Sequence, residues 1–413
     1  MPIPLKSSLR VLVLDEEIPY PLDSGKRLRT WHLLTTLAAR HQITFVAYGE
    51  ANSSAARALT GAGIEFIPVA PRRMETGAWQ YFRLLANFLS KRPFSVSKHD
   101  RRRFRGTVRR LINKRTFDLI QCEWTPYAQF VPKFSSYRNR PPFLIATHNI
   151  EADILARRGE KRSDILGRWF FTSQARRMER FERNVFSMAD HVTAVSTLDR
   201  ERIEAWGARE SSVVANGVDT DEITPHPGDV KSLELLFLGS LDWFANIEAV
   251  RFFLREIMPL IHAREPAVRF TVVGRRPGID LRDLLGSTEG ATLVGEVDDI
   301  RPYLYRAAAL VVPLRIGGGT RIKILEAMAA GKVVVSTRVG AEGLEVEDGV
   351  HVRLADTPRD FAAAAFEALH PAGSCHIAEA AREFVLERHS WRLQAMRLEE
   401  SWIAVAERLR AKS

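Results

Sequence analysis

The residues best suited to chemistry lie between positions 313 and 337, where glycines 317–319 precede a predicted helix. The helix is expected over 321–330, with Thr320 at its N-cap and Gly331 just past its end. Glycines before a helix let the backbone approach a ligand and present amide N–H groups at the positive end of the helix dipole. Arg321 and Lys323 stand in the first turn, where a cation opposes that dipole at a cost of about 0.3–1 kcal/mol. Because a bound anion reverses this cost, the pattern predicts a phosphate site.

A carboxylate follows one helical turn later, at Glu326 beside Lys323. At that level it is placed to accept hydrogen bonds from vicinal hydroxyls, such as those of a ribose. The alternative interpretation is a glycine-rich turn, a buried helix and a Glu326–Lys323 pair on a solvated face.

The same stretch resembles the donor-binding segment of the family 4 retaining glycosyltransferases. Their L-E-A-M-A-x-G-x-x-V-V core is matched by residues 325–335. The resemblance implies that Glu326 is a ribose ligand. A first glutamate, eight positions earlier, holds the donor sugar in that family. Gly318 stands there in this sequence, so either a backbone amide serves at that point or the sugar is held differently.

Further matches follow in the family's order. Gly239 and Ser240 resemble its glycine loop in the donor domain, but Ser240 and Ala245 replace an arginine and a lysine that bind the diphosphate there. We hypothesise that Arg321 and Lys323 compensate for both losses. The expected donor-binding residues are Gly239, Ser240, Gly318, Gly319, Thr320, Arg321, Lys323 and Glu326.

The first half of the chain carries the other candidates. A strand is predicted at 142–147, and His148 follows it and resembles the family's strand-end histidine near the donor sugar and acceptor. Glu123 likewise follows a predicted strand. Gly25 and Lys26 end a loop after the first strand and precede a helix expected from Arg27. We expect them to form an acceptor and phosphate loop. A plain turn with a solvated lysine is the alternative.

Length and the alternation of strands and helices indicate two α/β domains with parallel sheets. The resemblance implies the GT-B architecture, in which two Rossmann-like domains face a cleft. We expect an N-terminal acceptor-side domain at 1–218 and a donor domain at 219–391. A C-terminal helix over 392–413 is expected to return to the first domain.

Charge is distributed unevenly along the chain. Residues 1–188 contain 33 Lys and Arg against 16 Asp and Glu, whereas the remainder is acidic and the whole chain carries +10. The segment 79–115 is rich in both aromatic and basic residues, which is typical of contact with an anionic membrane surface. A solvated face is the alternative, and the sequence has no pattern of a nucleic-acid-binding motif.

The chemistry implied is transfer of a sugar from a nucleotide-sugar to a hydroxyl acceptor, with retention at the anomeric carbon. The basic segment suggests a lipid-linked or saccharide acceptor, in polysaccharide or glycolipid assembly. No D-x-D or His/Asp ligand cluster stands out, so we expect no metal and no other cofactor. Two cysteines exclude a disulfide framework, and we expect a cytoplasmic location, including a peripheral one on the inner face of the cytoplasmic membrane. A non-hydrolysing nucleotide-sugar epimerase and a non-catalytic nucleotide-binding homologue remain as alternatives.

Overall fold

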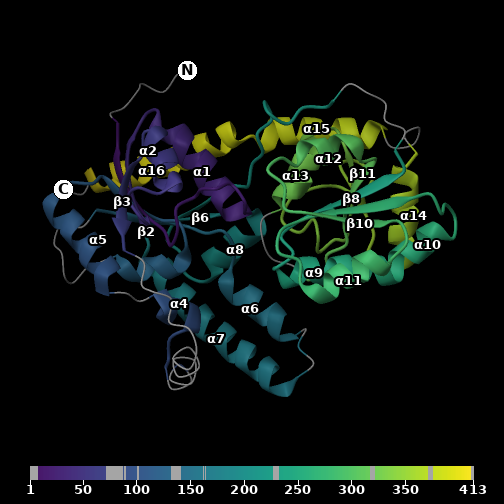
Figure 1. Ribbon diagram of the computed structural model, residues 1–413. Coiled ribbons are helices and arrows are strands. Elements are labelled where there is room, and N and C mark those ends of the chain that lie inside the picture. The colour runs from purple at the N-terminus through teal and green to yellow at the C-terminus, as the bar shows by residue number, and fades with distance from the viewer. Residues whose placement is uncertain are drawn as a thin grey trace. The chain divides into compact units, whose positions relative to one another are not determined.

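The computed structural model describes residues 8–70, 87, 90–99, 102–131, 141–160, 162, 164–226, 232–316, 321–370 and 375–410. The chain divides into two compact units (Figure 1). Unit 1 comprises Met1–Ala215 and Gln394–Ser413, and unit 2 comprises Asn216–Leu393.

Unit 1 is built on a parallel sheet of seven strands. They are β1 (Arg10–Leu14), β2 (Gln42–Tyr48), β3 (Glu65–Val69), β4 (Leu119–Cys122), β5 (Phe143–Ala146), β6 (His191–Ala194) and β7 (Ser211–Val213). Their order across the sheet is β3-β2-β1-β4-β5-β6-β7. This is the Rossmann order, in which the connections leave β1 and β4 on opposite faces of the sheet.

Helices connect these strands. They are α1 (Gly25–Ala38), α2 (Ser54–Gly61), α4 (Phe94–His99), α5 (Arg102–Lys114), the 3-10 turn η1 (Thr125–Phe130), α6 (Glu151–Glu160), α7 (Ile165–Met188) and α8 (Thr197–Ala205). Helix α1 begins two residues earlier than expected, because the Ser24 hydroxyl caps it by accepting from the Arg27 amide. Gly25 and Lys26 therefore lie in the first turn of a helix, and the expectation of a loop at these two residues is wrong.

Unit 2 repeats the arrangement with six parallel strands. They are β8 (Glu234–Leu238), β9 (Arg269–Val273), β10 (Ala291–Gly295), β11 (Ala309–Val312), β12 (Val333–Ser336) and β13 (Arg353–Leu354). Their order across the sheet is β10-β9-β8-β11-β12-β13. As in unit 1, the strand order reverses between the first and the fourth strand of the unit, β8 and β11. Both sheets together confirm the prediction of two Rossmann-like domains.

The helices of unit 2 cover both faces of its sheet. They are α9 (Phe244–Phe252), the π-turn η3 (Phe253–Ile257), α10 (Met258–His262), α11 (Ile279–Ser287), α12 (Arg301–Arg306), α13 (Ile322–Ala329), α14 (Pro358–Ala368) and α15 (Cys375–Arg388). In Figure 1, α12 and α13 lie on one side of this sheet, and α9 and α11 lie on the other. Because both faces are covered, strands β8 and β11 are buried throughout and, apart from Glu234, apolar.

The last helix, α16 (Trp391–Arg410), is anchored in unit 1 by its buried side chains. Trp402 is completely buried, and its indole N–H donates to Gln121 Oε1 on β4 at 2.5 Å. Glu399 Oε1 lies 2.8 Å from His41 Nε2. None of the helices in the described ranges combines the length and the apolar character needed to cross a membrane.

Candidate functional site

The polar residues of unit 2 gather where β8 and β11 lie side by side. Gly239 directly follows β8, and helix α13 follows β11. Connections that leave neighbouring strands on opposite faces open a crevice at the carboxyl edge of the sheet, which is where ligands bind in such folds. The topology therefore places the glycine loop and the start of α13 at one point.

Gly239 is surrounded closely at this edge. A Cβ there would lie 2.7 Å from Lys323 Nζ and 2.7 Å from Asn246 Nδ2. Gly274, after β9, is closer still, since its Cβ would lie 1.9 Å from the Gly239 carbonyl oxygen. Both positions require glycine, because any side chain would displace the loop that leads from β8 to α9.

Lys323 reaches into this loop from α13. Its Nζ donates to Asn246 Oδ1 at 3.1 Å and lies 4.5 Å from the centre of the Phe237 ring. Asn246 Nδ2 in turn donates to the Ser240 carbonyl at 2.9 Å, so one amide side chain connects the lysine to the loop. Burial, with the nearby Arg321, lowers the pKa of Lys323 to about 7. A bound anion would restore its full charge.

Glu326 lies one turn further along α13 and is partly buried. Burial raises the pKa of its carboxyl to about 7. Among the described residues Lys323 bonds to Asn246 and makes no ion pair with Glu326, so the alternative of a solvated pair is wrong. In this position Glu326 offers carboxyl oxygens that can accept hydrogen bonds from hydroxyl groups.

Arg321 is oriented differently from Lys323. It occupies the N-cap of α13, one residue later than the cap expected at Thr320, and is 7% exposed. Its guanidinium donates to the Val339 carbonyl at 2.9 Å and lies 3.7 Å from Glu342. The helix ends as expected, because Gly331 adopts a φ of 69° and closes the last turn through its bond to the Met328 carbonyl.

Arg275 is a cation at the glycine loop that the sequence did not predict. Arg275 follows Gly274 at the end of β9, and its Nε donates to the Ser240 hydroxyl at 2.9 Å. Ser240 thus accepts a hydrogen bond from an arginine that follows the neighbouring strand β9. The signal is a strand followed by glycine and arginine, the same pattern by which Gly239 and Ser240 are recognised.

Unit 1 gathers polar residues at the corresponding point between β1 and β4. Asp15 and Glu16 follow β1, and Lys26 Nζ lies 2.6 Å from Asp15 Oδ1 and 3.0 Å from Glu16 Oε1. Lys26 also lies 5.4 Å from the centre of the Trp124 ring. Burial raises the pKa of Asp15 to about 7, and the two carboxylates hold the pKa of Lys26 above its ordinary value despite its own burial. The alternative of a solvated lysine is therefore wrong.

His148 follows β5 and faces Glu123, which follows β4. Its Nε2 lies 3.4 Å from Glu123 Oε2, and both side chains are buried. Thr30 donates to the same carboxylate at 3.1 Å, and Gln121 donates to its other oxygen. Burial lowers the pKa of His148, whereas His148 and Arg29 hold that of Glu123 low despite burial. The lowered pKa values favour a neutral imidazole beside an ionised carboxylate. Among the described residues neither Nδ1 nor Nε2 of His148 has a hydrogen-bond partner.

Comparison with known proteins now identifies the chain. Residues 24–217 match the model of the glycosyl transferase 4-like domain, and residues 232–370 match that of glycosyl transferases group 1. The two matches together cover both units and show that the chain is a glycosyltransferase.

Two curated relatives of this glycosyltransferase are informative. An uncharacterized 44.6 kDa protein in the cps region of Klebsiella pneumoniae is 22% identical over 367 residues, which are 84% of this chain and 87% of that protein. The phosphatidyl-myo-inositol mannosyltransferase of Mycolicibacterium smegmatis is 32% identical over 169 residues, which are 39% and 43% of the two chains.

Solved structures share its fold. Sucrose-phosphate synthase from Thermosynechococcus elongatus has a TM-score of 0.71 at 16% identity and covers 98% of this chain and 100% of its own. Anabaena HepE in complex with UDP has a TM-score of 0.68 at 16% identity and covers 96% and 100%. At this identity the likeness establishes the GT-B type of fold.

Three predicted donor residues, Gly318, Gly319 and Thr320, lie outside the described residues of the glycosyltransferase. Within the described ranges, no group of three His, Cys, Asp or Glu side chains is arranged to hold a metal ion.

The basic segment 79–115 of the glycosyltransferase is described only at 87, 90–99 and 102–115. Helix α5 buries its apolar face, since Phe104, Val108 and Leu111 belong to the core of unit 1. That apolar face is therefore packed inside unit 1, and only the basic face of α5 is left to meet an anionic surface. Its basic face remains exposed.

Proposed function

We propose that this glycosyltransferase binds a nucleotide-sugar on unit 2 and transfers its sugar, with retention, to a hydroxyl acceptor bound on unit 1. The observation that carries the proposal is the approach of Lys323 to Gly239. An ammonium group against a glycine turn, beside helix termini, offers charge and amide donors to a diphosphate. Glu326, one turn along α13, offers acceptor oxygens to the ribose hydroxyls.

Transfer of this type depends on positioning and on stabilising the leaving diphosphate. Lys323 and the amides after Gly239 supply this stabilisation, with Arg275 as a further cation next to Ser240. Arg321 stays in the proposal as a positive charge at the start of α13. These cations take the place of a metal ion, so we propose that the reaction needs no metal or other cofactor.

The acceptor side of the proposal rests on the cluster in unit 1. His148 lies beside Glu123, burial lowers its pKa, and Lys26 lies nearby in the same unit. A neutral imidazole accepts a hydrogen bond from a sugar or acceptor hydroxyl. We propose that His148 contacts the donor sugar and the acceptor, and that Gly25 and Lys26 orient the acceptor.

The acceptor class is proposed as lipid-linked, in polysaccharide or glycolipid assembly at the inner face of the cytoplasmic membrane. The relative from a cps region and the relative that is a phosphatidyl-myo-inositol mannosyltransferase support this choice. The exposed basic face of α5 supports contact with an anionic surface.

Thermal stabilisation of the purified protein by UDP, GDP, ADP, CMP and inorganic phosphate tests the donor site. A ligand at about 100 times its dissociation constant adds roughly 2.7 kcal/mol to the free energy of unfolding. We expect one nucleoside diphosphate to stabilise the protein, and Lys323→Met to remove the effect. The matched control is Lys332→Met, whose ammonium bonds to the Tyr305 carbonyl near the other end of α13.

No shift with any nucleotide contradicts the proposal and favours a non-catalytic homologue. If a nucleotide stabilises Lys323→Met and Lys332→Met equally, the nucleotide binds away from Lys323. That result also contradicts the proposal. Conversion of a nucleotide-sugar to its epimer without an acceptor identifies the epimerase alternative.

A further inference from the structure

We propose that the start of helix α7 is a docking surface for an anionic phospholipid bilayer. The inference rests on the proposed contact with an anionic membrane, but it can hold or fail separately from sugar transfer, because this surface of unit 1 includes none of the proposed donor and acceptor residues. It rests on two observations, an exposed apolar tip and an arginine-lined pocket beside it.

The apolar tip consists of Ile165, Leu166 and Trp169, which are 84%, 82% and 57% exposed. Helices α6 and α7 pack side by side, and the start of α7 lies at the end of this pair away from the sheet of unit 1 (Figure 1). The buried positions of α7 begin only at Gln174. Three large apolar side chains within five residues form an exposed patch, which marks an interaction site rather than scattered surface.

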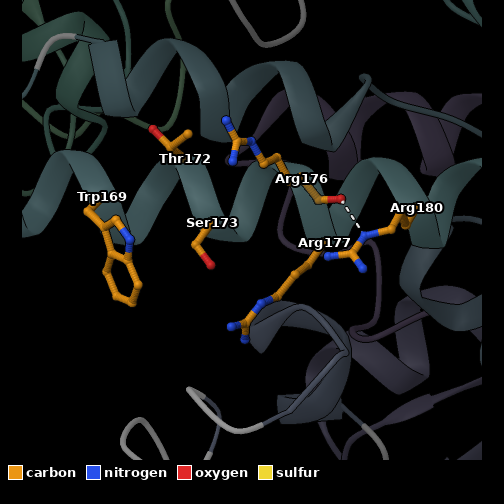
Figure 2. Close-up of a pocket in the computed structure, with 6 residues that line it drawn as sticks. All are labelled: Trp169, Thr172, Ser173, Arg176, Arg177 and Arg180. Carbon is orange, nitrogen blue, oxygen red and sulfur yellow. Dashed lines mark hydrogen bonds between the residues drawn. The ribbon is translucent and has the colours of Figure 1, made fainter.

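The pocket lies directly beyond this tip on the same helix. It has a volume of about 270 Å³ and is lined by Trp169, Thr172, Ser173, Arg176, Arg177 and Arg180. Figure 2 shows these side chains along α7, with Trp169, Ser173 and Arg177 projecting from one side at successive turns. Guanidinium groups and hydroxyls together are the donors that a phosphate group accepts from.

Hydrogen bonds to backbone carbonyls hold two arginine side chains of this pocket in place. Arg177 donates to the Asn87 carbonyl at 2.7 Å, and Arg180 Nε donates to the Arg176 carbonyl at 3.2 Å. Arg176 and Arg180 are exposed, and within the described residues neither of them forms an ion pair with a carboxylate. Their charge is thus directed to solvent or to an anionic partner.

The order of these groups along the helix matches the order of layers in a bilayer. Apolar Ile165 and Leu166 come first, Trp169 follows, and the arginines come last. In a bilayer the hydrocarbon core, the interface and the lipid phosphates follow one another in the same order. Arg176 lies about 10 Å along the axis from Trp169 at 1.5 Å per residue. A headgroup layer is roughly 5–8 Å thick. Because helical side chains lean toward the N-terminus, an inserted tip brings the Arg176 guanidinium toward the level of the lipid phosphates, and Arg180 lies about 6 Å further along the axis.

Charge complementarity selects an anionic bilayer as the occupant. Residues 1–188 contain 33 Lys and Arg against 16 Asp and Glu, so the unit that bears α7 attracts polyanionic surfaces. Exposed Arg102, Arg103, Arg109 and Arg110 of α5 add to this attraction in the same unit. An apolar tip together with exposed arginines fits a lipid surface better than an acidic protein, which would leave the tip in water.

Vesicle cosedimentation of the full chain tests the proposal. The two preparations are phosphatidylcholine alone and phosphatidylcholine with about one third phosphatidylglycerol. We expect binding to the anionic vesicles only, weakened by salt. Arg176→Glu with Arg180→Glu should lower the partition coefficient at least tenfold, and Trp169→Ala should lower it severalfold.

Two control variants keep the test specific. Arg282→Glu with Arg359→Glu changes the net charge equally on exposed arginines of unit 2. Ile279→Ser removes an apolar side chain of unit 2 that is 76% exposed. Both should bind like the unaltered protein, and all variants should keep its melting temperature. Failure of the unaltered protein to bind anionic vesicles overturns the proposal, as does equal binding by the arginine pair and its control.

Discussion

Lys323 on α13 donates a hydrogen bond to Asn246 at the start of α9, with 3.1 Å between Nζ and Oδ1. This bond connects helices α9 and α13, which follow the neighbouring strands β8 and β11. It also holds the ammonium 2.7 Å from the point where a Gly239 side chain would begin. The proposed donor site is therefore formed by two helices and one glycine.

Asn246→Ala should weaken nucleotide binding without removing it. The lysine keeps its charge but loses the acceptor that orients it. A hydrogen bond to a charged group contributes about 1.5–3 kcal/mol. We expect nucleoside diphosphate affinity, measured by calorimetry, to fall about tenfold. An unchanged affinity would mean that Lys323 does not meet the ligand where this bond directs it.

Nucleotide affinity should follow a bell-shaped pH profile with its maximum near pH 7. Lys323, with a pKa of about 7, loses its proton as pH rises, so diphosphate binding on the alkaline side requires proton uptake. Glu326, also with a pKa of about 7, gains a proton as pH falls, so ribose binding on the acid side requires proton release. The affinity should change up to about tenfold per pH unit on each side.

Single substitutions separate the two limbs of this profile. Lys323→Met should flatten the alkaline limb, and Glu326→Gln should flatten the acid limb. Calorimetry in buffers of different ionisation enthalpy measures the protons exchanged on each side. A profile that both variants leave unaltered would remove Lys323 and Glu326 from the donor site.

Gly274→Ala should destabilise unit 2 by about 1–3 kcal/mol, because the new Cβ would lie 1.9 Å from the Gly239 carbonyl oxygen. The displaced loop should also bind nucleotide less tightly. Gly286→Ala is the matched control, since no atom lies within 4 Å of its Cβ and it stands inside α11. There we expect a gain of about 0.5–1 kcal/mol. Chemical denaturation measures both, and equal stability of the two variants would refute the crowding argument.

Glu123→Gln should lower the transfer rate while leaving nucleotide affinity unchanged. It removes the charge beside His148, whose Nε2 lies 3.4 Å away, but keeps the shape of the side chain. His148→Ala should lower the rate further, and the double variant should be no slower than His148→Ala alone, because one residue acts through the other. Additive losses would show that Glu123 acts independently of the histidine.

The sequence predicted the strands and the strand-end residues well, because continuous apolar runs and the residues after them are local signals. It did not predict that Lys26 is enclosed by Asp15 and Glu16. Such contacts depend on which strands become neighbours. Arg275 was missed for the same reason, since its partner Ser240 lies 35 positions away. The apolar stripe of α5 indicated burial against a core as much as a membrane, and only packing distinguishes the two.

The most direct test of sugar transfer is analysis of the products by nuclear magnetic resonance. The protein is incubated with the nucleotide-sugar of the nucleoside diphosphate that stabilises it, with and without a bacterial lipid extract. We predict acceptor-dependent release of the nucleoside diphosphate and a glycosidic bond with the anomeric configuration of the donor, both lost in Lys323→Met and kept in Lys332→Met. An inverted product would contradict retention. An epimerised donor without acceptor, or no turnover with any nucleotide-sugar, would contradict the transferase account itself.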